Sequence, residues 1–178
     1  MTEQTRDILI TGASSGLGEA LARHYARPRR RLFLLGSPIA QSQSPLIHNT
    51  GFQVLGLPHV YERFETSTVD ERLVQLLHAP DFGGASVTIP LKLSIMQLLD
   101  SISPEAQVIG AVNTIVPRRD SDTGRVALHG ENTDWHAIYD RARAAHVRSD
   151  GLVALVIGAG GSARAALYAM HRLGASCI

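Results

Sequence analysis

The sequence has little of what marks secreted, membrane-spanning or nucleic-acid-binding proteins. Its single cysteine, Cys177, can form neither an intramolecular disulfide nor a cysteine-rich zinc site, which favours a cytoplasmic setting. No apolar run approaches the ~18 residues of a membrane span, and no basic-then-apolar signal opens the chain. The formal net charge of +1 gives no general attraction to nucleic acid or to a membrane surface. We expect neither as a partner.

What the chain does contain is enough apolar sequence for a folded core. Its 178 residues are 44% hydrophobic and 19% charged, which suits one good core, or one domain plus part of a second. The local basic run at 27–31 is interpreted as a solvated junction between segments.

Short apolar strands alternate with amphipathic helices, which is the pattern of an α/β fold. We expect strands at 7–10, 32–35, 59–65, 85–89, 111–116, 126–129, 152–157 and 175–178. We expect helices at about 14–26, 46–55, 69–77, 91–99, 134–145 and 163–173, with a short one after Pro104. The strands at 111–116 and 126–129 form a predicted hairpin, and the unbroken apolar run at 152–157 is typical of a parallel strand covered on both faces.

Two glycine-rich loops resemble the opening turn of a nucleotide-binding unit. Gly158, Ala159, Gly160, Gly161 and Ser162 lie between a predicted buried strand and a helix. In that context no Cβ blocks a diphosphate, and the helix N-terminus attracts it. The other loop, at 11–18, is similar to the start of a short-chain dehydrogenase, but that family's later Tyr-x-x-x-Lys motif has no counterpart here.

Several polar residues lie where predicted strands give way to helices. Ser42 and Ser44 precede a helix, where their hydroxyls suit a carboxylate ligand, although the local sequence by itself favours a helix cap. Thr88 and Lys92 flank a proline at a strand end, so both side chains can point into a cleft there. A lone lysine is otherwise a solvated surface group.

Three further residues complete this set of candidates. Asp134 is a natural carboxylate partner for the lysine, although it can also simply begin the helix that follows. Asn113 and Asn132, taken as isolated asparagines, can serve as turn residues.

Five strings in order resemble the shikimate dehydrogenase family, and most closely its fungal forms, in which this unit ends a multifunctional polypeptide of aromatic biosynthesis. They are GSPIAQSQSP (36–45), GGASVTIPLK (83–92), IGAVNT (109–114), GENTDW (130–135) and VIGAGGSAR (156–164). The resemblance implies a mixed-sheet substrate-binding domain at 32–149 and the first β-α unit of a Rossmann-type NADP domain at 150–178. Residues 1–31 then stand apart as a grafted short-chain-dehydrogenase-like start.

The resemblance also implies roles for the candidates. Lys92 and Asp134 would be the catalytic acid–base pair in the reduction of 3-dehydroshikimate to shikimate by NADPH. Ser42 and Ser44 would hold the substrate carboxylate, while Thr88, Asn113 and Asn132 would hold ring hydroxyls. The glycine loop at 158–162 would bind NADP.

The resemblance leaves three functions to compare. Because the nucleotide domain is incomplete, we expect little or no turnover from the 178 residues alone. The main alternative is a non-catalytic regulator of the quinate-repressor type that senses shikimate or quinate, although the retained lysine and aspartate favour an enzyme ancestry. A short-chain dehydrogenase fits poorly after residue 36. One departure from the family is Glu131, where many members have aspartate.

Overall fold

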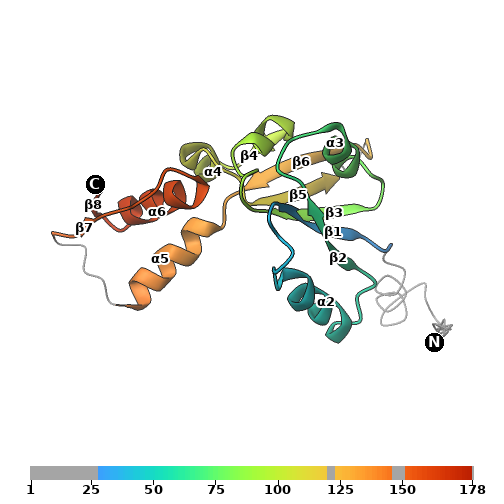
Figure 1. Cartoon of the computed structure of the whole chain (residues 1–178), viewed down its shortest axis with the longest axis horizontal. Coiled ribbons are helices and arrows are strands. Elements are labelled where there is room, and N and C mark those ends of the chain that lie inside the picture. The colour runs from blue at the N-terminus through green and yellow to red at the C-terminus, as the bar shows by residue number, and fades with distance from the viewer. Residues whose placement is uncertain (1–27, 120–122, 146–150, 178) are drawn as a thin grey trace.

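One mixed sheet organises most of the chain (Figure 1). The computed structural model describes residues 28–119, 123–145 and 151–177. The sheet has the order β2-β1-β3-β5-β6-β4. Its strands are β1 (Arg31–Gly36), β2 (Val60–Glu65), β3 (Phe82–Val87), β4 (Ser101–Ile102), β5 (Thr114–Arg119) and β6 (Val126–Glu131). β1 runs parallel to β2 and β3, β5 runs antiparallel to β3 and β6, and β4 is parallel to β6.

The helices pack on both faces of this sheet and extend from one end of it. Figure 1 shows α2 and α3 on opposite sides of the sheet, and α5 and α6 projecting away from its far end. The helical elements are α2 (Ser44–Val54), α3 (Glu71–Leu77), the 3-10 helix η1 (Ser94–Leu98), α4 (Pro104–Ile109), α5 (Asp134–Ala144) and α6 (Gly161–Arg172). β7 (Val153–Ala154) and β8 (Ser176–Cys177) form a separate parallel pair beside α6.

β1 is buried on both faces, which explains its unbroken apolar sequence. Phe33 and Leu35 enter the main core, which α3 and η1 also line, whereas Leu34 lies in a smaller cluster with Tyr61 on the α2 side. Successive strand residues point to opposite faces, so a strand covered on both sides needs apolar residues throughout. This arrangement fixes the strand's carboxyl end, where Gly36 begins the first motif.

A second apolar cluster joins the C-terminal elements to the sheet. Trp135 of α5 packs against Ala165 and Ala169 of α6, and against Ile109 and Ala111 at the end of α4. The small alanine side chains allow the helices to approach closely. Thus α6 is anchored on the segment that leads into β5.

Most of the predicted elements are confirmed, with shifts of a few residues at their ends. The helix expected at 91–99 is wrong in type: the chain forms only the 3-10 helix η1 at Ser94–Leu98 before it extends into β4 at Ser101. The strand expected at 152–157 is paired only at Val153–Ala154, and the side chains of Leu155 and Ile157 are exposed. The elements expected at 7–10 and 14–26 lie outside the described residues. Among those described, no helix has the length and apolar character to cross a membrane.

Candidate active site

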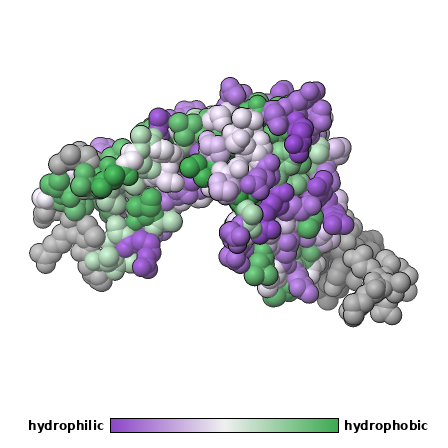
Figure 2. All heavy atoms as spheres, viewed as in Figure 1, coloured by the Kyte–Doolittle hydropathy of each residue, from purple (hydrophilic) through white to green (hydrophobic). Residues whose placement is uncertain are grey.

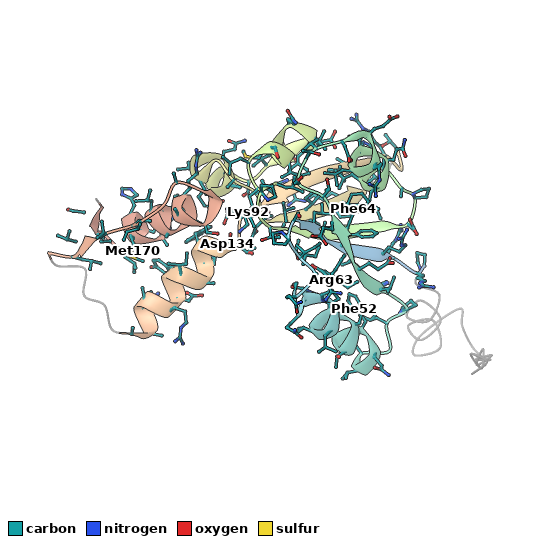
Figure 3. All side chains as sticks on the ribbon, in the orientation of Figure 1. Phe52, Arg63, Phe64, Lys92, Asp134 and Met170 are labelled. Atoms are coloured by element: carbon teal, nitrogen blue, oxygen red, sulfur yellow. The ribbon has the colours of Figure 1, made fainter. Side chains whose placement is uncertain are left out.

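Lys92 and Asp134 form an ion pair at the carboxyl edge of the sheet. The lysine Nζ lies 2.6 Å from Asp134 Oδ2, and the side chains are 13% and 28% exposed. Lys92 follows β3, and Asp134 follows β6 as the first residue of α5. Because β5 is antiparallel to both strands, β3 and β6 run in the same direction and end at one edge. Figure 3 shows the two residues together where α5 begins, above the broad notch visible in Figure 2.

Asn113 fixes the other oxygen of this carboxylate. Its Nδ2 donates to Asp134 Oδ1 at 2.8 Å, while its Oδ1 accepts from the Thr133 backbone N–H at 2.9 Å. A backbone N–H can only donate, so the amide oxygen must face Thr133 and the NH₂ group must face the aspartate. Both oxygens of Asp134 are therefore engaged, one by the lysine and one by Asn113.

Asn132 lies beneath the ion pair. It is 2% exposed. Its Oδ1 accepts from the Asp134 backbone N–H at 3.1 Å, and its Nδ2 donates to the Ala111 carbonyl at 2.9 Å. In this arrangement its amide holds the turn that carries Asp134. Its predicted contact with a substrate hydroxyl stays a prediction.

Glu131, the residue that departs from the family pattern, points elsewhere. Its carboxylate lies 2.9 Å from His129 Nε2, and Ser101 Oγ lies 2.8 Å from Nδ1 of the same ring. An ionised carboxylate only accepts, so Nε2 carries a proton and, in a neutral ring, Nδ1 accepts from the serine hydroxyl. The Glu131 backbone carbonyl accepts from the Asn113 N–H at 3.0 Å. The longer side chain of Glu131 thus takes part in a hydrogen-bond chain between β6 and β4 and does not contact the Lys92–Asp134 ion pair.

Ser42 and Ser44 line a pocket of about 360 Å³ together with Thr88. Gln43 is the N-cap of α2 and makes no side-chain capping bond, whereas Ser42 Oγ accepts from the backbone N–H of Ser44, the first residue of the helix, at 3.3 Å. The hydroxyls of the two serines lie 3.2 Å apart. Arg63 supports the loop by donating to the carbonyls of Ser42 and Ile39 at 2.6 and 3.1 Å. Arg63 escaped the sequence analysis, since nothing in the local pattern of β2 marks it.

Tyr61 lies under this pocket and was also missed. It packs with Leu34 and Ile39, which line the pocket, and its buried hydroxyl has no hydrogen-bond partner among the described residues. Burial raises the pKa of the Tyr61 phenol above its usual value of 10.0, because ionisation there would create a poorly solvated charge. Ser86 approaches the hydroxyl without meeting hydrogen-bond geometry, and this interaction offsets only part of the rise in pKa.

A second pocket of about 560 Å³ adjoins the first at Thr88. Lys92 lines it from one side, and the glycine loop, from Gly160 to Ala163, lines it from the other. The structure thus places the candidate carboxylate-binding serines, the ion pair and the candidate nucleotide loop along one continuous edge. Within the described ranges, no cluster of His, Cys, Asp or Glu suits a metal ion.

The glycine loop has the open geometry that a diphosphate needs. The N-cap of α6 is Gly160, which provides no side-chain cap, and a Cβ built there would meet nothing within 4 Å. The first backbone N–H groups of a helix have no partner inside it, so they are available to an anion. Gly158 has φ +133°, which favours glycine. These features fit the diphosphate part of a dinucleotide.

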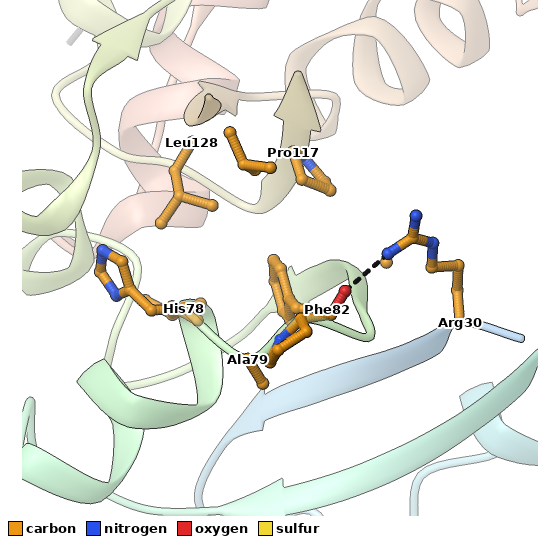
Figure 4. Close-up of a pocket in the computed structure, with 10 residues that line it drawn as sticks. Arg30, His78, Ala79, Phe82, Pro117 and Leu128 are labelled. Carbon is orange, nitrogen blue, oxygen red and sulfur yellow. Dashed lines mark hydrogen bonds between the residues drawn. The ribbon is translucent and has the colours of Figure 1, made fainter. Parts of the chain in front are cut away.

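A further pocket of about 310 Å³ lies at the opposite edge of the sheet (Figure 4). It is lined mainly by apolar residues of α3, β3, β5 and β6, and Arg30 at its rim donates to the Pro80 carbonyl at 2.7 Å. None of the predicted site residues lies there.

Known proteins share both the sequence and this fold. Residues 34–115 match the family model described as shikimate dehydrogenase substrate binding domain. The pentafunctional AROM polypeptide of Malassezia globosa is 62% identical over 185 residues, which covers 100% of this chain and 12% of that protein. The dehydroquinate dehydratase and shikimate dehydrogenase structure from S. pombe AroM has a TM-score of 0.71 at 49% identity, covering 89% of this chain and 30% of that one. Residues 34–115 carry the substrate binding domain of the shikimate dehydrogenase family.

Solved family members include ligand complexes. Shikimate 5-dehydrogenase from Thermus thermophilus, in complex with NADP(H) and shikimate, has a TM-score of 0.67 at 37% identity and covers 83% of this chain and 54% of that one. The present chain thus spans about half of such a bacterial enzyme and a small part of the AROM polypeptides. The Malassezia match includes residues 1–31, whose interpretation as a graft stays a prediction.

Proposed function

We propose that this chain binds shikimate and 3-dehydroshikimate and carries the acid–base residues of NADP-dependent shikimate dehydrogenation. The observation that carries the proposal is the Lys92–Asp134 ion pair, held by Asn113, between a hydroxyl-lined pocket and an open glycine loop. Residues 32–149 are the proposed substrate-binding domain, and 150–178 the start of the NADP domain. The lone cysteine suits a cytoplasmic setting.

In the proposed reaction, the Lys92 ammonium donates a proton to the carbonyl oxygen of 3-dehydroshikimate as that carbon is reduced. NADPH, when bound, supplies the hydride. Asp134 keeps the ammonium aimed and balances its charge, and Asn113 keeps the carboxylate from rotating away. In the reverse direction the neutral amine accepts the hydroxyl proton of shikimate.

The two serines are the proposed anchor for the substrate carboxylate. Their hydroxyls can each donate to a carboxylate oxygen, and the guanidinium of Arg63 beside the loop adds a favourable positive charge. Thr88 lines both pockets, so its hydroxyl is placed to bind a ring hydroxyl between the anchor and the ion pair. The loop at Gly158–Ser162 is the proposed site for the diphosphate of NADP.

Separate calorimetric titrations of shikimate, quinate and NADP test this proposal. We expect shikimate to bind, and Lys92→Met or Asp134→Asn to weaken it about tenfold, as for loss of one charged hydrogen bond. Arg72→Met is the matched control, because Arg72 is a cation that packs over Phe64 away from the site. Unchanged shikimate affinity in both site variants would contradict the proposal.

A turnover assay separates the enzyme from the metabolite sensor. Shikimate-dependent reduction of NADP that disappears in Lys92→Met supports catalysis. Binding of shikimate or quinate without any reduction of NADP is expected both of the sensor and of the 178 residues acting with the low turnover expected above, so only observed turnover discriminates between the two.

A further inference from the structure

The lysine of the ion pair also contacts the nucleotide loop. Lys92 Nζ donates to Ser162 Oγ at 3.3 Å, in addition to its 2.6 Å bond to Asp134. Ser162 is the second residue of α6, so its hydroxyl lies beside the free N–H groups at the start of that helix. The Ser162 side chain therefore contacts Lys92, the proposed proton donor, and also lies at the proposed anion site.

Packing and backbone hydrogen bonds hold Lys92 close to the start of α6. A Cβ on Gly161 would lie 3.1 Å from Lys92 Cβ and Cδ, so the lysine stem packs directly on the loop. The lysine carbonyl accepts from the Val112 N–H at 2.7 Å, and α6 packs against Ile109 and Ala111 of the same segment. Lys92 and α6 are thus anchored to one short stretch of chain, which holds their relative position.

A serine hydroxyl can bind an anion and the Lys92 ammonium at the same time, so anion binding at the loop can affect Lys92. The oxygen accepts a hydrogen bond from the ammonium while the hydroxyl proton remains free to donate to an anion oxygen. A hydroxyl that donates becomes a better acceptor, so the two hydrogen bonds strengthen each other. A diphosphate on the loop would then hold Lys92 more firmly against Asp134 and Ser162.

We propose that Ser162 is a positioning residue that couples the nucleotide loop to Lys92, so that a diphosphate at the loop and a substrate at the ion pair bind with positive cooperativity. The coupling to substrate rests on the proposed function, whereas the coupling of the loop to Lys92 does not. The proposal concerns this hydroxyl and leaves the role of the glycines as described.

Lys92 is the only lysine of the sequence, which makes the first test simple. Protein labelled with 13C-lysine gives a single side-chain Cε signal in NMR spectra. Titration with inorganic pyrophosphate is expected to shift that signal in the wild type and in Ser162→Thr, which keeps the hydroxyl. The shift should be lost in Ser162→Ala. Equal shifts in wild type and Ser162→Ala, or no shift in the wild type, would overturn the proposal.

The second test measures the coupling itself by titrating shikimate with and without pyrophosphate. We expect pyrophosphate to tighten shikimate binding about fivefold in the wild type and Ser162→Thr, and to leave it unchanged in Ser162→Ala. Ser94→Ala is the matched control, because Ser94 lies two residues from Lys92 and its hydroxyl donates to the Leu91 carbonyl at 3.3 Å. Weaker shikimate binding with pyrophosphate, or equal coupling in Ser162→Ala, would also overturn the proposal. A chain that binds no shikimate yet keeps the serine-dependent NMR shift would refute the proposed function alone.

Discussion

The sheet region and the C-terminal region of this molecule differ in how they are held together. The sheet region buries a continuous core in which Leu35, Leu73 and Ile115 are almost fully enclosed. The C-terminal region packs through one small cluster around Trp135, and its two strands have two residues each. In the described residues, Leu155 is 71% exposed and Ile157 90% exposed beside those strands.

The difference shows what an apolar run does and does not determine. The run at 152–157 has the composition of a strand covered on both faces, as β1 does. β1 has hydrogen-bonded neighbours on both sides, β2 and β3, whereas β7 pairs with β8 alone among the described strands. The apolar composition of a segment indicates that it can be buried. The length of the strand that it forms also depends on which neighbouring strands it can pair with.

The largest effect that we expect comes from the core of the sheet. Leu35→Ala removes a side chain that is fully buried between α3 and the strands, so it should lower the free energy of unfolding by about 3 kcal/mol. Leu155→Ala deletes the same atoms from an exposed position and should change it by less than about 0.5 kcal/mol. Urea unfolding followed by circular dichroism measures both. Similar losses of unfolding free energy in the two variants would mean that Leu155 is as tightly packed as Leu35, contrary to the proposed difference between the regions.

A smaller and more local effect is expected from the C-terminal cluster. Ala165→Leu inserts a larger side chain where α6 meets Ile109 and Trp135, which should cost about 2 kcal/mol through overpacking. Trp135 is the only tryptophan, so its fluorescence reports this region alone. We expect its emission to change at lower urea than the circular dichroism signal in the variant. Coincident transitions would mean that the two regions unfold as one unit.

The sequence was most informative where local pattern and burial agree. The strands β1 and β2 and the helices α3, α5 and α6 were predicted within a few residues, and the motif residues Lys92, Asp134 and Asn113 do lie together. The contacts of Arg63 and Tyr61 depend on which strand lies beside which loop, and no short-range pattern encodes that. The Lys92–Ser162 contact likewise joins residues 70 positions apart.

The smallest stability effect that we predict concerns the buried hydroxyl of Tyr61. Because that hydroxyl has no partner among the described residues, Tyr61→Phe should raise the free energy of unfolding by about 1 kcal/mol near neutral pH. Tyr139→Phe is the matched control, since Tyr139 is only partly buried, and its effect should stay within about 0.5 kcal/mol.

The same variant tests the pKa of Tyr61. Burial raises that pKa in the folded state, so above about pH 10 the unfolded chain loses the phenol proton while the folded chain still keeps it. The unfolded state then binds fewer protons, so ionisation of this group leaves the free energy of unfolding unchanged below about pH 10 and lowers it as the pH rises from there through the folded-state pKa. Urea unfolding between pH 8 and about pH 11 should show a steeper decline for the wild type than for Tyr61→Phe. Parallel declines would mean that Tyr61 ionises equally easily in both states, and hence that the floor of the serine pocket is open to water.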